Sequence, residues 1–257
     1  MVNVKQQWNT VKNNTILLTY YPDLIFVSAD RIEGTLRIRA LYDQAVQKIV
    51  IDPFTKDKNN PFYIEDSYII KIDFPKDPQR QAPSVYEISG RIIKAGKARG
   101  VINPLDLHLF KDGRSCLCPQ PLLFEYILSG KISDLQIFLD ELVTPYFYQQ
   151  SFFERFGYWP VKNYSHGYPA IFEYYQRERS KLGQTNKHLV GLCSISLLSL
   201  ADLHKYLKPL LENKREIKST SKCFCGSEKK YKKCHRRKFT KEAREGIVKF
   251  MEDIRKI

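Results

Sequence analysis

The clearest secondary-structure signal in the chain is YIIKIDFP, residues 68–75. Its large apolar side chains recur at every second position, at Tyr68, Ile70, Ile72 and Phe74. Because successive side chains of a β-strand point to opposite faces, this period of two places all four on one face. Pro75 cannot donate a hydrogen bond to a sheet and therefore ends the strand. The stretch predicts a strand with one buried face.

The sequence on both sides of this strand predicts an antiparallel meander. Apolar or alternating segments bounded by turn residues indicate further strands at 24–29, 35–41, 47–52 and 84–90. A turn is expected at 33–35, between the first two of them. The segment 94–115 is rich in Gly, Lys and Pro, and we expect it to be irregular.

The second half of the chain is predicted to be helical. Ser133 resembles an N-cap because Gln136 follows three positions later, as in a capping box, and Pro145 should break the helix that they begin. Further helices are expected at 146–157, 169–183, 189–207 and 240–257, and at the N-terminus around Val4, Trp8 and Val11. Strands followed by helices make α+β the expected fold class.

Length and composition fit a globular protein. The chain has 257 residues, of which 43% are hydrophobic, which is enough to bury at least one sizeable core. The longest uncharged apolar run, 189–201, is shorter than the roughly 20 residues that cross a membrane. The first residues lack the apolar run of a signal peptide. We therefore expect a cytoplasmic protein without a membrane partner.

Positive charge is concentrated in the last fifth of the chain. The formal net charge is +14, and residues 205–257 hold 18 Lys and Arg against 7 Asp and Glu. Such a segment could bind nucleic acid or an acidic protein. No groove-reading motif accompanies the charge, so a solvated basic tail is the simpler interpretation.

The segment 223–235, CFCGSEKKYKKCH, contains a full ligand set for zinc. Three thiolates and one imidazole complete a tetrahedral site, and they would come from Cys223, Cys225, Cys234 and His235. Because no position stays open for water, we expect one structural Zn²⁺ per chain. The segment closely resembles the SEC-C motif, a small zinc module appended to many bacterial proteins. That resemblance implies docking on a partner rather than catalysis.

A second Cys-x-Cys pair, Cys116 and Cys118, lies too far from other ligand residues to hold a metal, because only His108 is close. The segment HLFKDGRSCL, residues 108–117, has the spacing His-x-x-x-x-Gly-x-x-Cys-Leu. With the meander and the Phe-Pro before it, this order of features resembles bacterial ubiquitin-conjugating-enzyme-like proteins of CBASS-type anti-phage operons. Residues that fit the same family follow at Glu154, Gly157, Trp159 and His166.

This resemblance covers residues 1–170 and implies a conjugating enzyme. Cys116 would carry a ubiquitin-like modifier as a thioester and pass it to an amine, with His108 as a catalytic residue and Cys118 and His166 as accessory residues. Eukaryotic members place an Asn oxyanion donor where this chain has Phe110. The thiol should be exposed and partly ionised, favoured by the basic residues at positions 111 and 114.

The implied partners are a separate activating (adenylating) enzyme, a protein target, and either a ubiquitin-like modifier or the modifier-like C-terminus of a nucleotidyltransferase. The implied domains are a ubiquitin-conjugating-enzyme-like domain at 1–168, a helical linker at 169–218, and the SEC-C segment with a basic helix at 219–257.

Other interpretations stay open. The chain could be a catalytically inactive, zinc-containing adaptor that binds a protein or nucleic acid, with Cys116 an ordinary half-buried thiol. His108 and His166 could only brace loops, and Trp159 is more simply a core residue. Cys193, in a Leu-rich segment, is most simply a small buried hydrophobic residue.

Overall fold

A computed structural model of the chain describes residues 19–51, 60–77, 80–182, 187–197, 220, 230–234 and 240–256. The chain forms two compact units. Unit 1 comprises Met1–Cys118 and Tyr126–Lys162, and unit 2 comprises Pro119–Glu125 and Asn163–Ile257. The helix predicted around Val4, Trp8 and Val11 lies outside the described residues.

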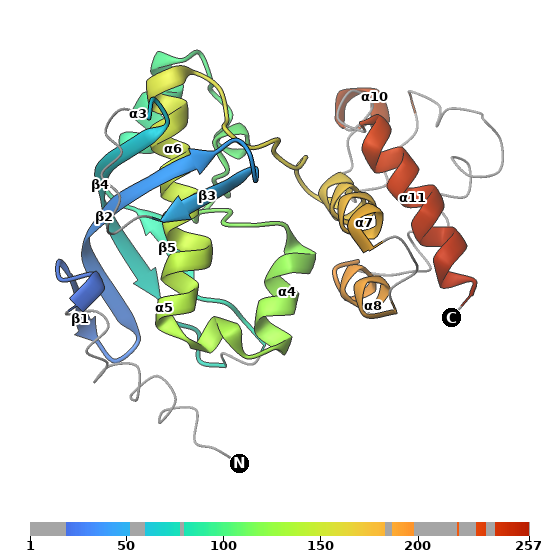
Figure 1. The fold of residues 1–257 in the computed structure, drawn as a ribbon, viewed down its shortest axis with the longest axis horizontal. Coiled ribbons are helices and arrows are strands. Elements are labelled where there is room, and N and C mark those ends of the chain that lie inside the picture. The colour runs from blue at the N-terminus through green and yellow to red at the C-terminus, as the bar shows by residue number, and fades with distance from the viewer. Residues whose placement is uncertain are drawn as a thin grey trace. The chain divides into compact units, whose positions relative to one another are not determined.

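Unit 1 contains a five-stranded antiparallel sheet (Figure 1). Its strands are β1 (Leu24–Ser28), β2 (Arg31–Asp43), β3 (Lys48–Ile51), β4 (Tyr63–Asp73) and β5 (Ser84–Glu87). The order is β1-β2-β4-β5, and β3 pairs with the far end of β2. The predicted α+β class and the antiparallel pairing are therefore confirmed. The sheet is not a simple meander, because β2 pairs with β4 and β3 lies off this path.

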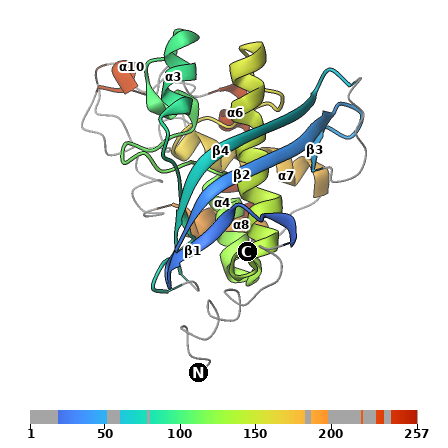
Figure 2. The same cartoon turned by 90° about the vertical axis from the view of Figure 1, so that its left-hand side faces the viewer.

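The period-two pattern of β4 has the predicted consequence. Tyr68, Ile70 and Ile72 are at most 3% exposed, and each lies on the face that also buries alternate residues of β2. Helix α6 (Thr144–Phe156) packs on this face, against β2, β3 and β4 (Figure 2). The opposite face carries cross-strand ion pairs such as Arg31 with Asp73, at 2.6 Å. The sheet thus packs one apolar face against a helix and exposes the other.

The predicted turn at 33–35 is wrong. The chain reverses at Ala29 and Asp30, and β2 continues through Gly34. Gly34 has φ 144°, and a Cβ atom there would lie 2.0 Å from the carbonyl oxygen of Asp23. Glycine is needed here because the backbone of Asp23 passes too close for any side chain. A glycine inside a strand often marks such a close approach of two backbones.

The segment predicted to be irregular begins as a helix, α3 (Arg91–Ala98), and continues into the 3-10 turn η1 (Pro104–Leu107). Long-range contacts explain the difference. The guanidinium of Arg91 bonds the carboxylates of Asp66 and Glu154, and that of Arg99 bonds two carbonyl groups at the end of α6. These bonds hold both ends of a helix whose local propensity is weak because of its glycine.

The helical stretch that follows comprises α4 (Gln120–Leu128), η2 (Lys131–Ser133), α5 (Leu135–Phe138), the π-helical segment η3 (Leu139–Val143) and α6. The N-cap is Asp134, whose carboxylate accepts from the amide of Ile137 at 3.0 Å, so the prediction of Ser133 was wrong. Pro145 does not break the helix. The amide of Thr144 bonds the carbonyl of Leu139, an i→i−5 bond of the π turn, which accommodates a proline without a backbone donor.

Unit 2 is helical, with α7 (Tyr168–Leu182), α8 (Lys187–Ile195), α10 (Tyr231–Cys234) and α11 (Lys241–Ile254). The predicted helix 189–207 ends at Ile195, and residues from 198 lie outside the described part. Helices α7, α8 and α11 share a buried core that includes Phe172, Tyr175, Cys193 and Phe250. Cys193 is fully buried, as predicted. None of the described helices combines the length and apolar character that crossing a membrane requires.

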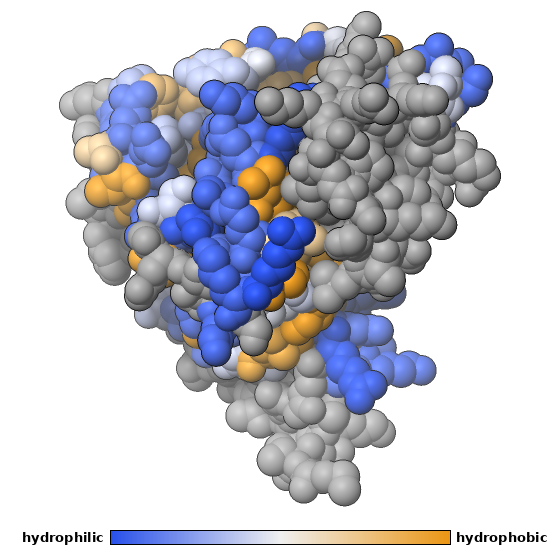
Figure 3. Space-filling model, turned by 90° about the vertical axis from the view of Figure 1, so that its right-hand side faces the viewer, coloured by the Kyte–Doolittle hydropathy of each residue, from blue (hydrophilic) through white to orange (hydrophobic). Residues whose placement is uncertain are grey.

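Helix α11 is fastened to α7 at both ends. At its start, the N-cap hydroxyl of Thr240 donates to the buried carboxylate of Glu173 at 2.5 Å. Near its end, the buried carboxylate of Asp253 accepts from Tyr175 at 2.7 Å and from Arg179 at 2.6 Å. The stretch Lys241–Ile254 is therefore a packed helix rather than part of a wholly solvated tail. Its outward surface is mainly hydrophilic (Figure 3).

The close crossing of α7 and α11 gives a stability prediction. A Cβ atom at Gly246 would lie 2.0 Å from the carbonyl oxygen of Phe172, so Gly246→Ala must push the helices apart. We expect the free energy of unfolding to fall by about 2 kcal/mol, as overpacking usually costs. Gly191→Ala, on α8, is the control because nothing lies within 4 Å of its added Cβ. Urea unfolding in which the two variants behave alike would contradict the crossing.

Candidate functional site

Cys116 lies at the end of a short β-hairpin, His108–Cys116, here called the Cys116 hairpin. The amide of Cys116 donates to the carbonyl of His108 at 2.7 Å, and that of Phe110 donates to the carbonyl of Arg114 at 2.8 Å. The turn closes at Gly113, whose φ of 84° favours glycine. The glycine three residues before the cysteine therefore has a local structural purpose.

The hairpin continues the sheet of unit 1 at the edge formed by β5. The amide of Ser115 donates to the carbonyl of Val85 at 2.8 Å, and Arg114 forms an isolated bridge with Tyr86. Backbone bonds to a strand fix the hairpin more firmly than a free loop would be fixed.

Helix α6 supports the root of the hairpin from the buried side. The hydroxyl of Tyr146 donates to the carbonyl of His108 at 3.2 Å, and the side-chain amide (Nε2) of Gln150 donates to the carbonyl of Leu107 at 2.9 Å. Sequence reasoning did not single out these two residues. The available signal was the position of Gln150, since a polar residue falls among the apolar positions of an otherwise aromatic helix face.

The two thiols of this region are only partly accessible. Burial raises the pKa of the Cys116 thiol to about 11, and the positive charge of Arg114 opposes this rise without cancelling it. Burial raises the pKa of Cys118 further, and a charge on Cys116 would add to that shift. Burial therefore acts against the partly ionised thiol that the resemblance implies for Cys116. Of the two, Cys116 is the easier to ionise.

His108 enters the site mainly through its backbone. Its φ of 54° is uncommon for a residue with a side chain, and its carbonyl accepts from both Cys116 and Tyr146. Its ring meets Trp159 edge-on at 5.0 Å, and Trp159 stacks on Phe153 at 4.6 Å. The half-buried Trp159 is thus a support for His108 rather than a core residue.

Two further residues from the sequence analysis, Phe110 and His166, remain to be placed. Phe110, where the resemblance led us to look for an Asn donor, is 39% exposed and carries the guanidinium of Arg114 over its ring at 4.8 Å. It has no side-chain donor for an oxyanion. His166 belongs to unit 2, where it is half-buried, and its accessory role stays a prediction.

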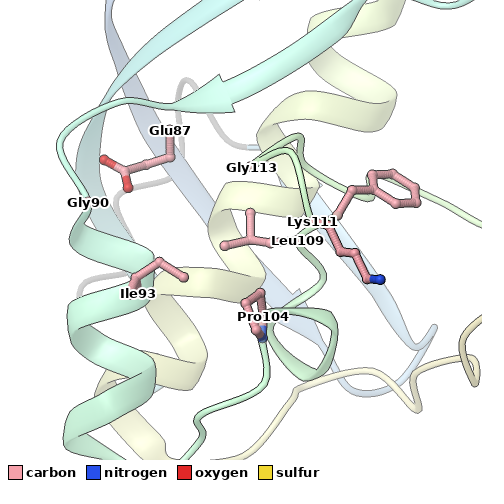
Figure 4. Close-up of a pocket in the computed structure, with 8 residues that line it drawn as sticks. Glu87, Gly90, Ile93, Pro104, Leu109, Lys111 and Gly113 are labelled. Carbon is pink, nitrogen blue, oxygen red and sulfur yellow. The ribbon is translucent and has the colours of Figure 1, made fainter.

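A cleft of about 180 Å³ adjoins the Cys116 hairpin. Ile93 of α3, Pro104 of η1 and Leu109 of the hairpin lie around it (Figure 4). Lys111 and Glu87 contribute its charged lining. The carboxylate of Glu87 bonds the amide of Ile92 at 3.3 Å and so caps α3.

The predicted zinc ligands lie largely outside the described residues. Cys223, Cys225 and His235 are not described, and Cys234 is the last residue of α10. Within the part of the chain that the structure describes, no cluster of His, Cys, Asp or Glu could hold a metal ion. The donor set itself fits zinc, because three thiolates and an imidazole are the ligands of a closed structural site.

Comparison with known proteins supports the assignment of a SEC-C motif to this segment. The SEC-C motif, which in general binds zinc, matches residues 220–237 and includes all four predicted ligands. Searches of curated proteins and of solved structures gave no match to the chain. The chain therefore contains a SEC-C motif in its last fifth.

Proposed function

We propose that the chain is a ubiquitin-like-protein conjugating enzyme, with Cys116 as the residue that carries the modifier. The observation that carries this proposal is the placement of a partly accessible thiol at the end of a hairpin that is bonded to a sheet edge and supported by a helix. Such a fixed position is what acyl transfer between two docked proteins requires. The antiparallel sheet before the hairpin and the helices after it agree with the family that residues 108–117 resemble.

The chemical step needs no cofactor from this chain. The thiolate of Cys116 attacks the carbonyl carbon of a modifier thioester on the activating enzyme, a new C–S bond forms, and the activating enzyme's thiolate leaves. An amine of the target then attacks the Cys116 thioester, loses a proton, and releases the Cys116 thiolate. The first exchange replaces one thioester by another, so it is nearly neutral in free energy.

A thiol pKa of about 11 suits a carrier that reacts only with its proper donor. At neutral pH about one thiol in 10⁴ is ionised, so reaction with stray electrophiles is slow. Once ionised, such a thiolate is strongly nucleophilic, since nucleophilicity rises with pKa. A docked donor that supplies positive charge near Arg114 would increase the ionised fraction.

The SEC-C motif and its zinc form the second part of the proposal. Cys223, Cys225, Cys234 and His235 would hold one Zn²⁺ per chain, and the metal would stabilise a small knuckle that docks on a protein partner. The activating enzyme, the modifier (or a modifier-like C-terminus of a nucleotidyltransferase) and the target are all proposed partners. The anti-phage setting belongs to the same proposal.

One observation favours a different class of function. Because burial raises the pKa of Cys116, the thiol is also compatible with an inert residue in an adaptor. In that case unit 1 would bind one partner without catalysis, and the SEC-C motif would bind another.

Intact mass spectrometry separates the two functions. The wild-type chain and Cys116→Ser would be expressed in native cells beside the neighbouring genes and weighed with and without reductant. We expect a reductant-labile adduct on the wild type and a reductant-stable ester on Cys116→Ser, whose mass identifies the modifier. An unmodified chain in both samples, with zinc still bound, would contradict the conjugating enzyme and favour the adaptor.

A further inference from the structure

The hydrogen bonds that α6 makes to the Cys116 hairpin carry a further inference about how the thiol is controlled. Tyr146 and Gln150 lie four residues apart and so share one face of α6. They are 3% and 4% exposed, and each donates to a consecutive carbonyl, those of His108 and Leu107. His108 is the first residue of the Cys116 hairpin, and Leu107 directly precedes it.

The carbonyl of His108 links the Cys116 backbone to helix α6. It accepts from the amide of Cys116 at 2.7 Å and from the hydroxyl of Tyr146 at 3.2 Å. His108 also has the left-handed conformation, with φ 54° and ψ 39°. A residue with a side chain keeps that conformation only where surrounding bonds hold it. The hydroxyl of Tyr146 is one such bond, and it reaches the backbone that positions Cys116.

The path of the helix brings both residues to the hairpin. The π-helical segment η3 immediately precedes α6, and its wider turn shifts the register of every later residue on the helix. Tyr146 and Gln150 are the residues that this register places at the hairpin root. Such segments occur often at functional sites, because they redirect side chains without ending a helix.

We infer that Tyr146 and Gln150 are positioning residues that limit the exposure of the Cys116 thiol and set its reactivity. The groups around the thiol are Arg114 on the hairpin, Tyr146 on α6 and the neighbouring Cys118. Loss of the Tyr146 hydroxyl loosens the hairpin root and exposes the sulfur to more water. The desolvation that raises the thiol pKa then weakens.

Tyr148 on the same helix is a matched control. It is fully buried, and its hydroxyl also donates to a backbone carbonyl, that of Phe62, at 2.7 Å. Tyr146→Phe and Tyr148→Phe each remove a hydroxyl that donates to a backbone carbonyl. Phe62 lies outside the Cys116 hairpin, so a purely structural role would give both variants the same effect.

The test is the rate at which iodoacetamide alkylates Cys116 between pH 7 and pH 10, in full-length chains that also carry Cys118→Ser. One unit of pKa changes the thiolate fraction about tenfold, so we expect Tyr146→Phe to react about three to ten times faster than its parent at pH 8. Gln150→Met should shift the rate in the same direction. Tyr148→Phe should stay within about twofold of the parent, since thiolate fraction governs the rate.

Two results would overturn the inference: a pH profile of Tyr146→Phe that superimposes on that of its parent, or an equal shift in Tyr148→Phe. A second readout rests on the proposed function. Thioester formation on Cys116 should fall in Tyr146→Phe even though alkylation rises, because the sulfur is less well placed. If no variant forms a thioester, the proposed function fails while the alkylation result still decides the role of Tyr146.

Discussion

Replacing Cys116 with alanine is expected to abolish the reductant-labile adduct of the chain, with a loss of at least about 100-fold. Cys118→Ala is expected to keep the adduct within about threefold of the wild type, as a residue outside the chemistry would. The amide of Cys116 is fixed by the carbonyl of His108, and its thiol ionises more easily than that of Cys118. Densitometry of nonreducing gels, with mass spectrometry of the band, measures both variants.

The pH dependence of adduct formation follows from the thiol pKa of about 11. Because that pKa lies above the working range, the thiolate fraction, and with it the rate, should rise about tenfold per unit from pH 7 to pH 10. A rate that stays flat above pH 8 would show that a docked partner already lowers the pKa of Cys116.

The two alanine variants also have an outcome that would contradict the assignment of the nucleophile. Retention of the adduct in Cys116→Ala with loss in Cys118→Ala would assign the chemistry to Cys118.

Zinc binding is expected to be lost in Cys234→Ser. The wild-type chain should hold one Zn²⁺, and the variant well under half of that when purified without added metal, because a structural site depends on all four ligands. The measurement is inductively coupled plasma mass spectrometry of the dialysed protein. Cys118→Ser is the control, and unchanged zinc in it shows that the two Cys-x-Cys pairs do not share a metal.

Removal of zinc should leave the helical core of unit 2 in place. That core is made by α7, α8 and α11 and contains none of the four ligands. The far-ultraviolet circular dichroism of the chelated chain should therefore keep most of its helical signal, although local order near residues 220–237 is lost. A cooperative loss of the whole helical signal on chelation would show that the metal holds the core together.

The sequence alone was sufficient to predict local structure wherever a residue pattern is compatible with only one conformation. Alternating apolar residues at Tyr68, Ile70 and Ile72 have one buried face in any sheet, and the structure buries them. Gly157 ends α6 with φ 79°, and Thr240 caps α11, as their residue types predict. The SEC-C segment was also readable, because its four ligand residues are close in sequence.

Where the sequence was misleading, distant contacts outweighed local preference. The glycine-containing start of 94–115 is helical because Arg91 and Arg99 bond partners on β4 and α6. Pro145 lies within a continuous helical stretch because a π turn precedes it. Gly34 is in the middle of β2 because the backbone of Asp23 approaches it. The π turn directly precedes Pro145, whereas the partners of Arg91, Arg99 and Gly34 lie further away along the chain.

The candidate site divides in the same way. The sequence determined that Cys116 follows a glycine turn and a histidine, since Gly113 and His108 precede it at fixed spacing. Only the tertiary structure decided how reactive the thiol is. Partial burial at the end of the hairpin raises its pKa, and Tyr146, thirty residues away along the chain, bonds the carbonyl that positions it. Solvation of a sulfur atom depends on every neighbour in space, and the order of residues specifies those neighbours only through the folded chain.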